Sequence, residues 1–96
     1  MSISTIIVAI LEMLDDVDFT DTISAEVFHI APEKFEDIVS AMCDEELVSC
    51  KYRVGTLQDG LCITRESTTI TPRGVKYLYE MKAIKLVLKQ QIIQRV

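Results

Sequence analysis

The chain has 96 residues and a mass of 10.9 kDa, which is enough for one hydrophobic core and excludes two folded domains. Hydrophobic residues make up 49% of it and charged residues 26%. This composition is too apolar for a disordered chain and too evenly mixed for a membrane-spanning one. We therefore expect a single compact, soluble domain over residues 1–96, without a membrane partner.

The net charge of −5 conceals opposite charges in the two halves of the chain. Residues 1–48 contain 12 acidic side chains and only Lys34 as a base, a balance of −11. Residues 49–96 contain nine basic and three acidic side chains, a balance of +6. Such an asymmetry bears on which partners are attracted and not on the fold.

The cysteines and the N-terminal segment favour a cytoplasmic protein. Cys43, Cys50 and Cys62 are odd in number and show no C-x-x-C spacing, which argues against a disulfide framework and a zinc ribbon. We expect reduced and mostly buried thiols. Residues 1–14 are apolar but amphipathic, lack a basic leader and a cleavage site, and are too short to span a bilayer.

The first predicted element is an amphipathic helix. Apolar residues recur at i, i+3, i+4, i+7, i+8 and i+11 from Ile3 to Leu14, and Ser2 or Ser4 can cap the N-terminus. The acidic run at 15–18 consists of poor helix formers that compete for the backbone. It therefore ends the helix and opens an acidic loop.

A helix-turn-helix is predicted next. Ser24 can cap a short helix over residues 25–28. His29 lies where the chain must turn, and histidine tolerates the left-handed conformation better than most residues. Pro32 suits the first turn of a third helix, which we expect to extend over residues 32–47.

The remaining elements are a hairpin and a long helix. Alternating apolar and polar residues predict strands over residues 48–54 and 61–65, and residues 66–69 are ambiguous. Thr71 can cap a last helix that begins at Pro72 and continues to the C-terminus. The order of elements predicts an α+β, mostly helical fold of the winged helix-turn-helix type, with a two- to three-stranded wing.

These residues also resemble the YjcQ-type small winged-helix proteins of Gram-positive bacteria and their phages. The resemblance is carried by I-S-A-E at 23–26, F-H-I-A-P-E at 28–33, F-E-D-I at 35–38, D-E-E-L-V at 44–48 and I-T-P-R-G-V-K-Y-L at 70–78. Its most specific segment is I-T-x-x-G-x-x-Y-L, a pattern shared with many bacterial winged-helix regulators. The resemblance implies a DNA-binding or regulatory module without a defined activity.

The chain departs from that family pattern at three positions. His29 replaces the usual glycine of the turn between helices, and Ala31 replaces a capping serine. Glu46 stands where a glycine normally ends the third helix. The last change adds a negative charge beside the start of the wing.

The sequence shows no signature of catalysis or metal binding. It has one histidine and no nucleophile elbow, phosphate-binding loop or H-E-x-x-H pair. His29 is flanked by Phe28 and Ile30, so we expect it to be structural. The acidic run at 16–21 lacks the glycine and the glutamate of a calcium loop. We predict no enzyme, catalytic residue, cofactor or metal.

The charge of the predicted third helix favours a protein partner over DNA. A helix-turn-helix normally lays its second helix in the major groove, but residues 32–47 carry six acidic side chains and one basic side chain. Phosphates would repel such a helix. We expect it to present an acidic partner-binding face made of Glu33, Glu36, Asp37, Asp44 and Glu45.

The basic half of the chain leaves two alternatives open. It could contact phosphates through the wing and the last helix, which would make the protein an atypical DNA-binding regulator. It could also be a solvated surface that balances the acidic half. The candidate contacts are Lys51, Arg53, Arg65, Arg73, Lys76, Lys82, Lys85 and Lys89.

The last helix is apolar on two sides. Tyr79, Leu86 and Ile93 recur every seven residues on one face, and Met81, Ile84, Leu88 and Ile92 occupy another. A helix that is apolar on two sides is buried on two sides. We therefore expect association through residues 72–96, as a homodimer or with a protein partner. Tighter packing of this helix on the first helix is the alternative.

Overall fold

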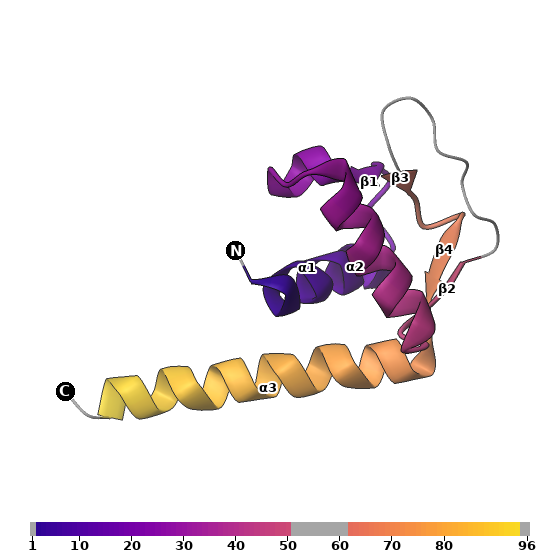
Figure 1. Ribbon diagram of the computed structural model, residues 1–96. Helices are drawn as coiled ribbons and strands as arrows, with labels where there is room; N and C mark the ends of the chain where they lie inside the picture. The colour runs from indigo at the N-terminus through magenta and orange to yellow at the C-terminus, as the bar shows by residue number, and fades with distance from the viewer. Residues whose placement is uncertain (1, 51–61, 95–96) are drawn as a thin grey trace.

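The computed structural model of the chain describes residues 2–50 and 62–94, with the side chains of the last helix described as far as Val87. Within these residues, three α-helices and two small antiparallel sheets give the α+β, mostly helical fold of a winged helix with a short wing. The elements are α1 (Ile3–Asp15), β1 (Ile23–Ser24), the 3₁₀ helix η1 (Ala25–Phe28), α2 (Pro32–Asp44), β2 (Val48–Cys50), β3 (Cys62–Ile63), β4 (Thr68–Ile70) and α3 (Pro72–Gln94), as Figure 1 shows.

The hydrophobic core lies where α1, η1 and α2 meet the sheets and the first turns of α3. The apolar spacing of α1 places Ile6, Ile10 and Leu11 on one face, where they are fully buried. Phe35 and Met42 of α2 enter the same core. Because burying a side chain of this size stabilises the fold by about 1.5–3 kcal/mol, these apolar faces hold the helices together.

The predicted limits of α1 are confirmed. The hydroxyl of Ser2 accepts a hydrogen bond from the backbone N–H of Thr5 at 3.2 Å, which satisfies a donor of the first turn. At the other end, Asp16 has an extended backbone, and its carboxylate accepts a hydrogen bond from the N–H of Asp18 at 2.9 Å. Such a bond between a side chain and a nearby backbone N–H competes with the helical hydrogen bonds, which is why an acidic run ends a helix.

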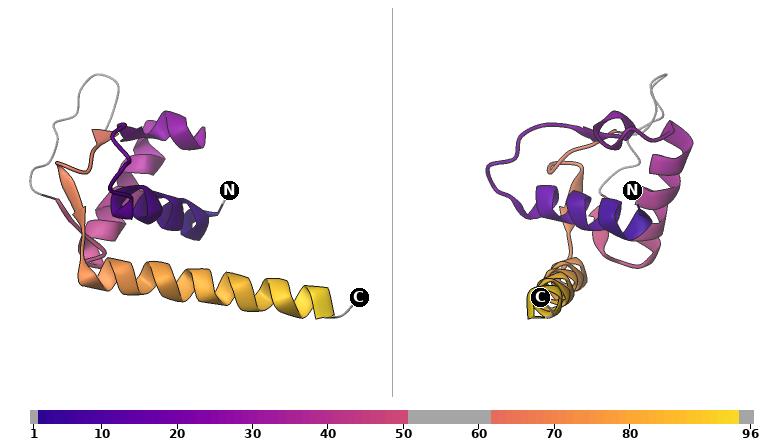
Figure 2. Two further views of the ribbon diagram at one scale, coloured as in Figure 1. Left: turned by 180° about the vertical axis from the view of Figure 1, so that it is seen from behind. Right: turned by 90° about the vertical axis from the view of Figure 1, so that its left-hand side faces the viewer.

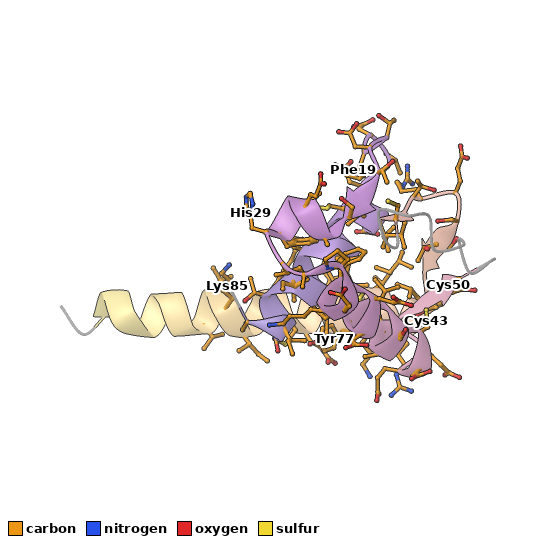
Figure 3. All side chains as sticks on the ribbon, turned by 45° about the horizontal axis from the view of Figure 1, so that its top comes forward. Phe19, His29, Cys43, Cys50, Tyr77 and Lys85 are labelled. Carbon is orange, nitrogen blue, oxygen red and sulfur yellow. The ribbon has the colours of Figure 1, made fainter. Side chains whose placement is uncertain are left out.

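The turn between η1 and α2 confirms the prediction for His29. Its backbone is left-handed, with φ 55° and ψ 42°, and its N–H donates to the carbonyls of Ala25 and Glu26. The imidazole is exposed at the outer edge of the turn (Figure 3). Ser24 occupies the N-cap position of η1, but its side chain makes no capping hydrogen bond, because the residue also ends β1.

α2 is shorter than predicted, since it ends at Asp44 and not near Leu47. Glu46 has a φ of 59°. Its N–H donates to the carbonyl of Cys43 at 3.1 Å, and the N–H of Leu47 donates to the carbonyl of Met42 at 2.9 Å. This pair of bonds is a Schellman motif, whose left-handed residue is usually glycine. Glutamate therefore occupies the glycine position that the sequence indicated.

The strands pair differently from the predicted hairpin. We expected residues 48–54 to pair with residues 61–65, but β2 pairs with β4, and β3 pairs with β1. The register aligns Val48 with Ile70, Ser49 with Thr69 and Cys50 with Thr68 in one sheet, and Ile23 with Ile63 and Ser24 with Cys62 in the other. Residues 51–54 of the predicted first strand lie outside the described residues.

A tight turn after β3 explains the different pairing. The hydroxyl of Ser67 accepts a hydrogen bond from the N–H of Thr64 at 3.0 Å, and the N–H of Thr68 donates to the carbonyl of Thr64 at 2.9 Å. These bonds bend the chain between β3 and β4, so the two strands join different sheets. Ser67 and Thr68 are buried. The alternation of apolar and polar residues in the sequence did not predict buried polar side chains at these positions.

α3 begins at the predicted cap and extends well beyond the rest of the molecule. The hydroxyl of Thr71 accepts a hydrogen bond from the N–H of Gly74 at 2.9 Å. Leu78 is fully buried against the core, but from Lys82 to Val87 every side chain is exposed. The helix therefore continues alone (Figures 1 and 2), and the molecule measures 50 × 27 × 26 Å. No helix in the described residues is apolar enough over a sufficient length to cross a membrane.

Candidate interaction surfaces

α2 has one apolar side and one acidic side. Phe35, Ile38 and Met42 face the core. The opposite side follows the spacing i, i+3, i+4, i+7 and i+11, which gathers side chains along one face of a helix. The exposed residues at these positions are Glu33, Glu36, Asp37, Ser40 and Asp44.

The acidic face comprises Glu33, Glu36, Asp37 and Asp44 of α2 together with Glu45 at its C-cap, and all five are exposed. Neighbouring like charges at i, i+3 or i, i+4 destabilise a helix by about 0.2–0.5 kcal/mol per pair. Among the described residues, only Glu45 of this face has a salt bridge, to Arg73 at 4.0 Å. Lys34 is the one cation on α2. The helix therefore presents a negative surface that the described part of the chain leaves almost unbalanced.

Arg65 has a structural role that the sequence did not reveal. Its guanidinium donates one hydrogen bond to the carbonyl of Leu14 at 3.3 Å and another to the carbonyl of Val17 at 2.8 Å. These carbonyls belong to the last turn of α1 and to the loop that follows, so the cation lies at the negative end of the helix. The sequence placed Arg65 among the candidate phosphate contacts, but the structure directs its N–H groups to the backbone.

The basic residues of α3 lie close to carboxylates. Lys82 is 3.6 Å from Glu12 of α1, and Lys76 is 4.0 Å from Glu80 one turn later. Lys85 is exposed (Figure 3) and has no salt bridge among the residues that the structure describes. The remaining candidates lie outside the description, namely Lys51, Arg53 and the side chain of Lys89.

α3 carries an apolar face outside the core. Tyr79, Ala83, Leu86 and Val87 follow the spacing i, i+4, i+7 and i+8 and are all exposed. The exposed fractions are 56% for Tyr79, 57% for Leu86 and 51% for Val87, and the adjacent Ile84 is 54% exposed. The alternative that the last helix packs tightly on the first helix is therefore wrong for these residues. The side chain of Ile93, the third predicted dimer contact, lies outside the description.

A groove of about 630 Å³ lies beside the first turns of α3. Three segments distant in the sequence build it, so no sequence motif indicated it. Its apolar residues are Ile7, Leu47 and Tyr77, and its charged residues are Glu45, Arg73, Lys76 and Glu80.

The cysteines lie at different depths. Cys43 and Cys62 are partly buried, whereas Cys50 is exposed (Figure 3). The expectation of mostly buried thiols is wrong for Cys50, because only Val48 of the short strand β2 reaches the core. No group of three or more histidine, cysteine or acidic side chains is placed to hold a metal ion in the part of the chain that the structure describes.

The comparison with known proteins agrees with the resemblance seen in the sequence. A family model with the description YjcQ protein matches residues 5–94, a range that begins in α1 and ends in α3. No curated protein matches the chain, and no solved structure does. Because the family match covers nearly the whole chain, the protein belongs to the YjcQ family.

Proposed function

We propose that this protein is a small regulatory module without enzymatic activity, and that it binds a basic surface of a protein partner through the acidic face. The observation that supports this most directly is the position of the acidic face on α2, opposite the buried side of the helix. In a helix-turn-helix this is the helix that approaches a ligand. Basic side chains on a partner would relieve the repulsion among its carboxylates and guide the encounter.

The same arrangement disfavours duplex DNA in front of α2. Duplex DNA carries one negative charge per about 1.7 Å of its axis, and two unit charges about 4 Å apart interact by about 1 kcal/mol in water. Six exposed carboxylates from Glu33 to Glu46 would meet that charge, whereas Lys34 is the one cation on α2 and Arg73 pairs only with Glu45 among the described residues. Insertion of α2 into the major groove would thus cost several kcal/mol before any base was contacted.

The alternative is an atypical DNA-binding regulator that contacts phosphates through the wing and α3. It has less support because Arg65 is bonded to the backbone of α1, and because Lys76 and Lys82 lie beside carboxylates. Exposed salt bridges are weak and can be exchanged for phosphates. Arg65, however, could bind a phosphate only by giving up its two hydrogen bonds to the backbone of α1 and the loop after it.

A DNA titration distinguishes the two functions. We expect the wild-type protein not to bind a labelled random duplex at micromolar concentration, even at a low salt concentration of about 50 mM. Changing Glu36 and Asp37 together to lysine should create or strengthen binding, because it reverses the charge in the middle of the acidic face. As a matched control, Asp18 and Asp21 can be changed to lysine in the loop after α1, where the same charge change should have little effect.

Micromolar binding by the wild-type protein, with a steep decrease as salt is added, would contradict the proposal. The alternative would gain support if that binding were lost when Lys85 was changed to glutamate. Either result would indicate that the ligand is DNA and that the basic residues of α3 and the wing bind it, and not α2.

The partner itself can be sought by cross-linking. A photoreactive residue at Glu36 should join α2 to a partner segment rich in lysine and arginine in host cells, whereas one at Val17 should not. The lysine variant of Glu36 and Asp37 should bind the purified partner about tenfold more weakly or worse. Reversing the charges on the partner should restore binding to that variant. A contact segment without basic residues would argue against recognition by charge.

A further inference from the structure

We propose that the basic surface bound by the acidic face is the DNA-binding site of another protein, and that α2 occupies this site in place of one DNA strand. This inference rests on the function proposed above and names the class of partner. It is carried by the spacing of the carboxylates on α2, by their lack of partners within the described chain and by the place of α2 in the fold. The protein then acts by competing with DNA and not by binding it.

The carboxylates on the outer side of α2 have a charge density close to that of a DNA strand. Four of them form one row along the helix, which we call the acidic row, namely Glu33, Glu36, Asp37 and Asp44. Its ends are 11 positions apart, which is about 17 Å in a helix that rises about 1.5 Å per residue. One strand of duplex DNA has a charge about every 3.4 Å, or about five phosphates over the same length. A surface that follows one DNA strand therefore meets a similar charge along α2.

No cation interrupts the acidic row. Lys34 follows Glu33 directly, so it lies about 100° around the helix and to one side of the row. Arg73 pairs with Glu45, which follows α2 at its C-cap and is not part of the row. Among the described residues, no salt bridge or side-chain hydrogen bond involves a carboxylate of the row. Their oxygens can therefore accept hydrogen bonds from a partner, as phosphate oxygens of DNA do.

The stability of α2 does not explain these charges. The last turn of the helix contains Asp44 and no basic residue, although the C-terminal end of a helix is negative and is stabilised by cations. At the other end, Glu33 stands three and four residues before Glu36 and Asp37, a spacing at which like charges repel each other. The acidic row therefore works against the helix that carries it. A ligand of opposite charge accounts for it.

The fold presents the acidic row to large partners. In the right-hand view of Figure 2, α2 runs along one edge of the molecule, and its buried residues Phe35, Ile38 and Met42 face the core. In DNA-binding proteins with a helix-turn-helix, the corresponding helix enters the major groove, so it stands where a macromolecule can reach it. With carboxylates in place of bases, this helix suits a surface that attracts phosphates. Such surfaces are found on proteins that bind DNA.

A cross-linking competition in host lysate tests the inference. A photoreactive amino acid in place of Ser40, which is exposed between Asp37 and Asp44, leaves every carboxylate of the acidic row in place. We expect it to join a protein that also binds random duplex DNA. Added duplex DNA should prevent the cross-link, and treatment of the lysate with nuclease should increase it. Polyglutamate at the same concentration of charge is the control for general ionic competition and should be about tenfold weaker than DNA.

The outcomes separate this inference from the proposed function on which it rests. A cross-link to a basic segment that duplex DNA does not prevent would overturn the DNA-binding site as the target and leave the proposed function intact. The same holds if polyglutamate competes as well as DNA, or if RNA prevents the cross-link and duplex DNA does not. If no basic segment is cross-linked at all, both the inference and the proposed function are wrong.

Ser40→Asp tests the acidic row directly, because it adds a carboxylate between Asp37 and Asp44. With the cross-linked partner purified, this variant should displace a labelled duplex from it at about a fivefold lower concentration than the wild type. Val17→Asp is the matched control, because it adds the same charge at a valine that is 74% exposed in the loop after α1, and it should act as the wild type does. Glu36→Gln should need about a fivefold higher concentration, and circular dichroism checks that α2 is intact in each variant. If Ser40→Asp and Glu36→Gln both displaced the duplex as the wild type does, the proposal would be wrong.

Discussion

Replacing Gly74 by alanine should destabilise the protein, although alanine is the better helix former. The change would gain up to about 1 kcal/mol of helix propensity in α3. However, the added Cβ would overlap the carbonyl oxygen of Leu47 and would lie 2.9 Å from Cγ1 of Ile70. Because a main-chain carbonyl cannot rotate away as a side chain can, α3 would have to move away from the end of α2.

That movement would weaken the hydrogen bonds that join the segment after α2 to Thr71, the residue that caps α3. The carbonyl of Leu47 accepts one from the N–H of Thr71 at 3.1 Å, and the hydroxyl of Thr71 donates another to the carbonyl of Glu46. Overpacking costs about 1–3 kcal/mol, and a weakened hydrogen bond costs about 1 kcal/mol more. After the gain in propensity, we expect a net loss of about 2 kcal/mol, which lowers the Tm of a domain of this size by about 8–16 °C.

Thermal unfolding followed by circular dichroism measures this loss. The control is Ala41→Gly on the exposed side of α2, which makes the reverse change where nothing is crowded and should cost about 1 kcal/mol through propensity alone. A Gly74→Ala protein with an unchanged or higher Tm would refute the close approach of α3 to Leu47.

Three further substitutions can be compared by chemical denaturation. Glu46→Gly should raise the free energy of unfolding by about 1 kcal/mol, because Glu46 has a φ of 59°, a conformation that glycine adopts without strain. The control Glu45→Gly, at a φ of −81°, should not raise it. If both variants had the same effect, backbone strain at Glu46 would not be the cause. Arg65→Lys should lower the free energy of unfolding by about 1–2 kcal/mol, since an ammonium cannot reproduce both hydrogen bonds of the guanidinium. The control Arg73→Lys, in an exposed salt bridge, should change it by less than about 0.5 kcal/mol. An Arg65→Lys protein as stable as the wild type would show that the two hydrogen bonds do not stabilise the fold. Thr71→Val should lower the free energy of unfolding by about 1 kcal/mol through loss of the cap of α3. Thr71→Ser, which keeps the hydroxyl, should retain most of the wild-type stability. If Thr71→Ser were as unstable as Thr71→Val, packing of the threonine methyl group would explain the loss.

The helices could be predicted from the sequence because their signals are local. Ser2 caps α1, and Thr71 caps α3, through bonds to residues three positions later. The positive φ values at His29 and Glu46 also follow from position, since each residue stands where a helix ends and a glycine is usual. The candidate acidic face was predictable for the same reason, because helical spacing alone places its carboxylates opposite the apolar stripe.

The pairing of the strands could not be predicted, because it depends on residues that are distant in the sequence. β1 and β3 have two residues each, too few to show an alternation. Arg65 illustrates the same limit, since the carbonyls that it contacts lie 51 and 48 positions earlier in the chain. A cation in a sequence indicates a charged surface residue by default. Only the packed fold shows that backbone acceptors take its N–H groups.

The charge asymmetry of the chain bears on the proposed contact of the acidic face. Lys82 lies beside Glu12, and Arg65 binds carbonyls at the end of α1. On the acidic face, among the described residues, only Glu45 pairs with a cation from the second half of the chain, Arg73. Among the described residues, Glu33, Glu36, Asp37 and Asp44 therefore have no salt bridge to a cation of the second half of the chain. This favours a basic partner for the acidic face and weakens any attraction to phosphate.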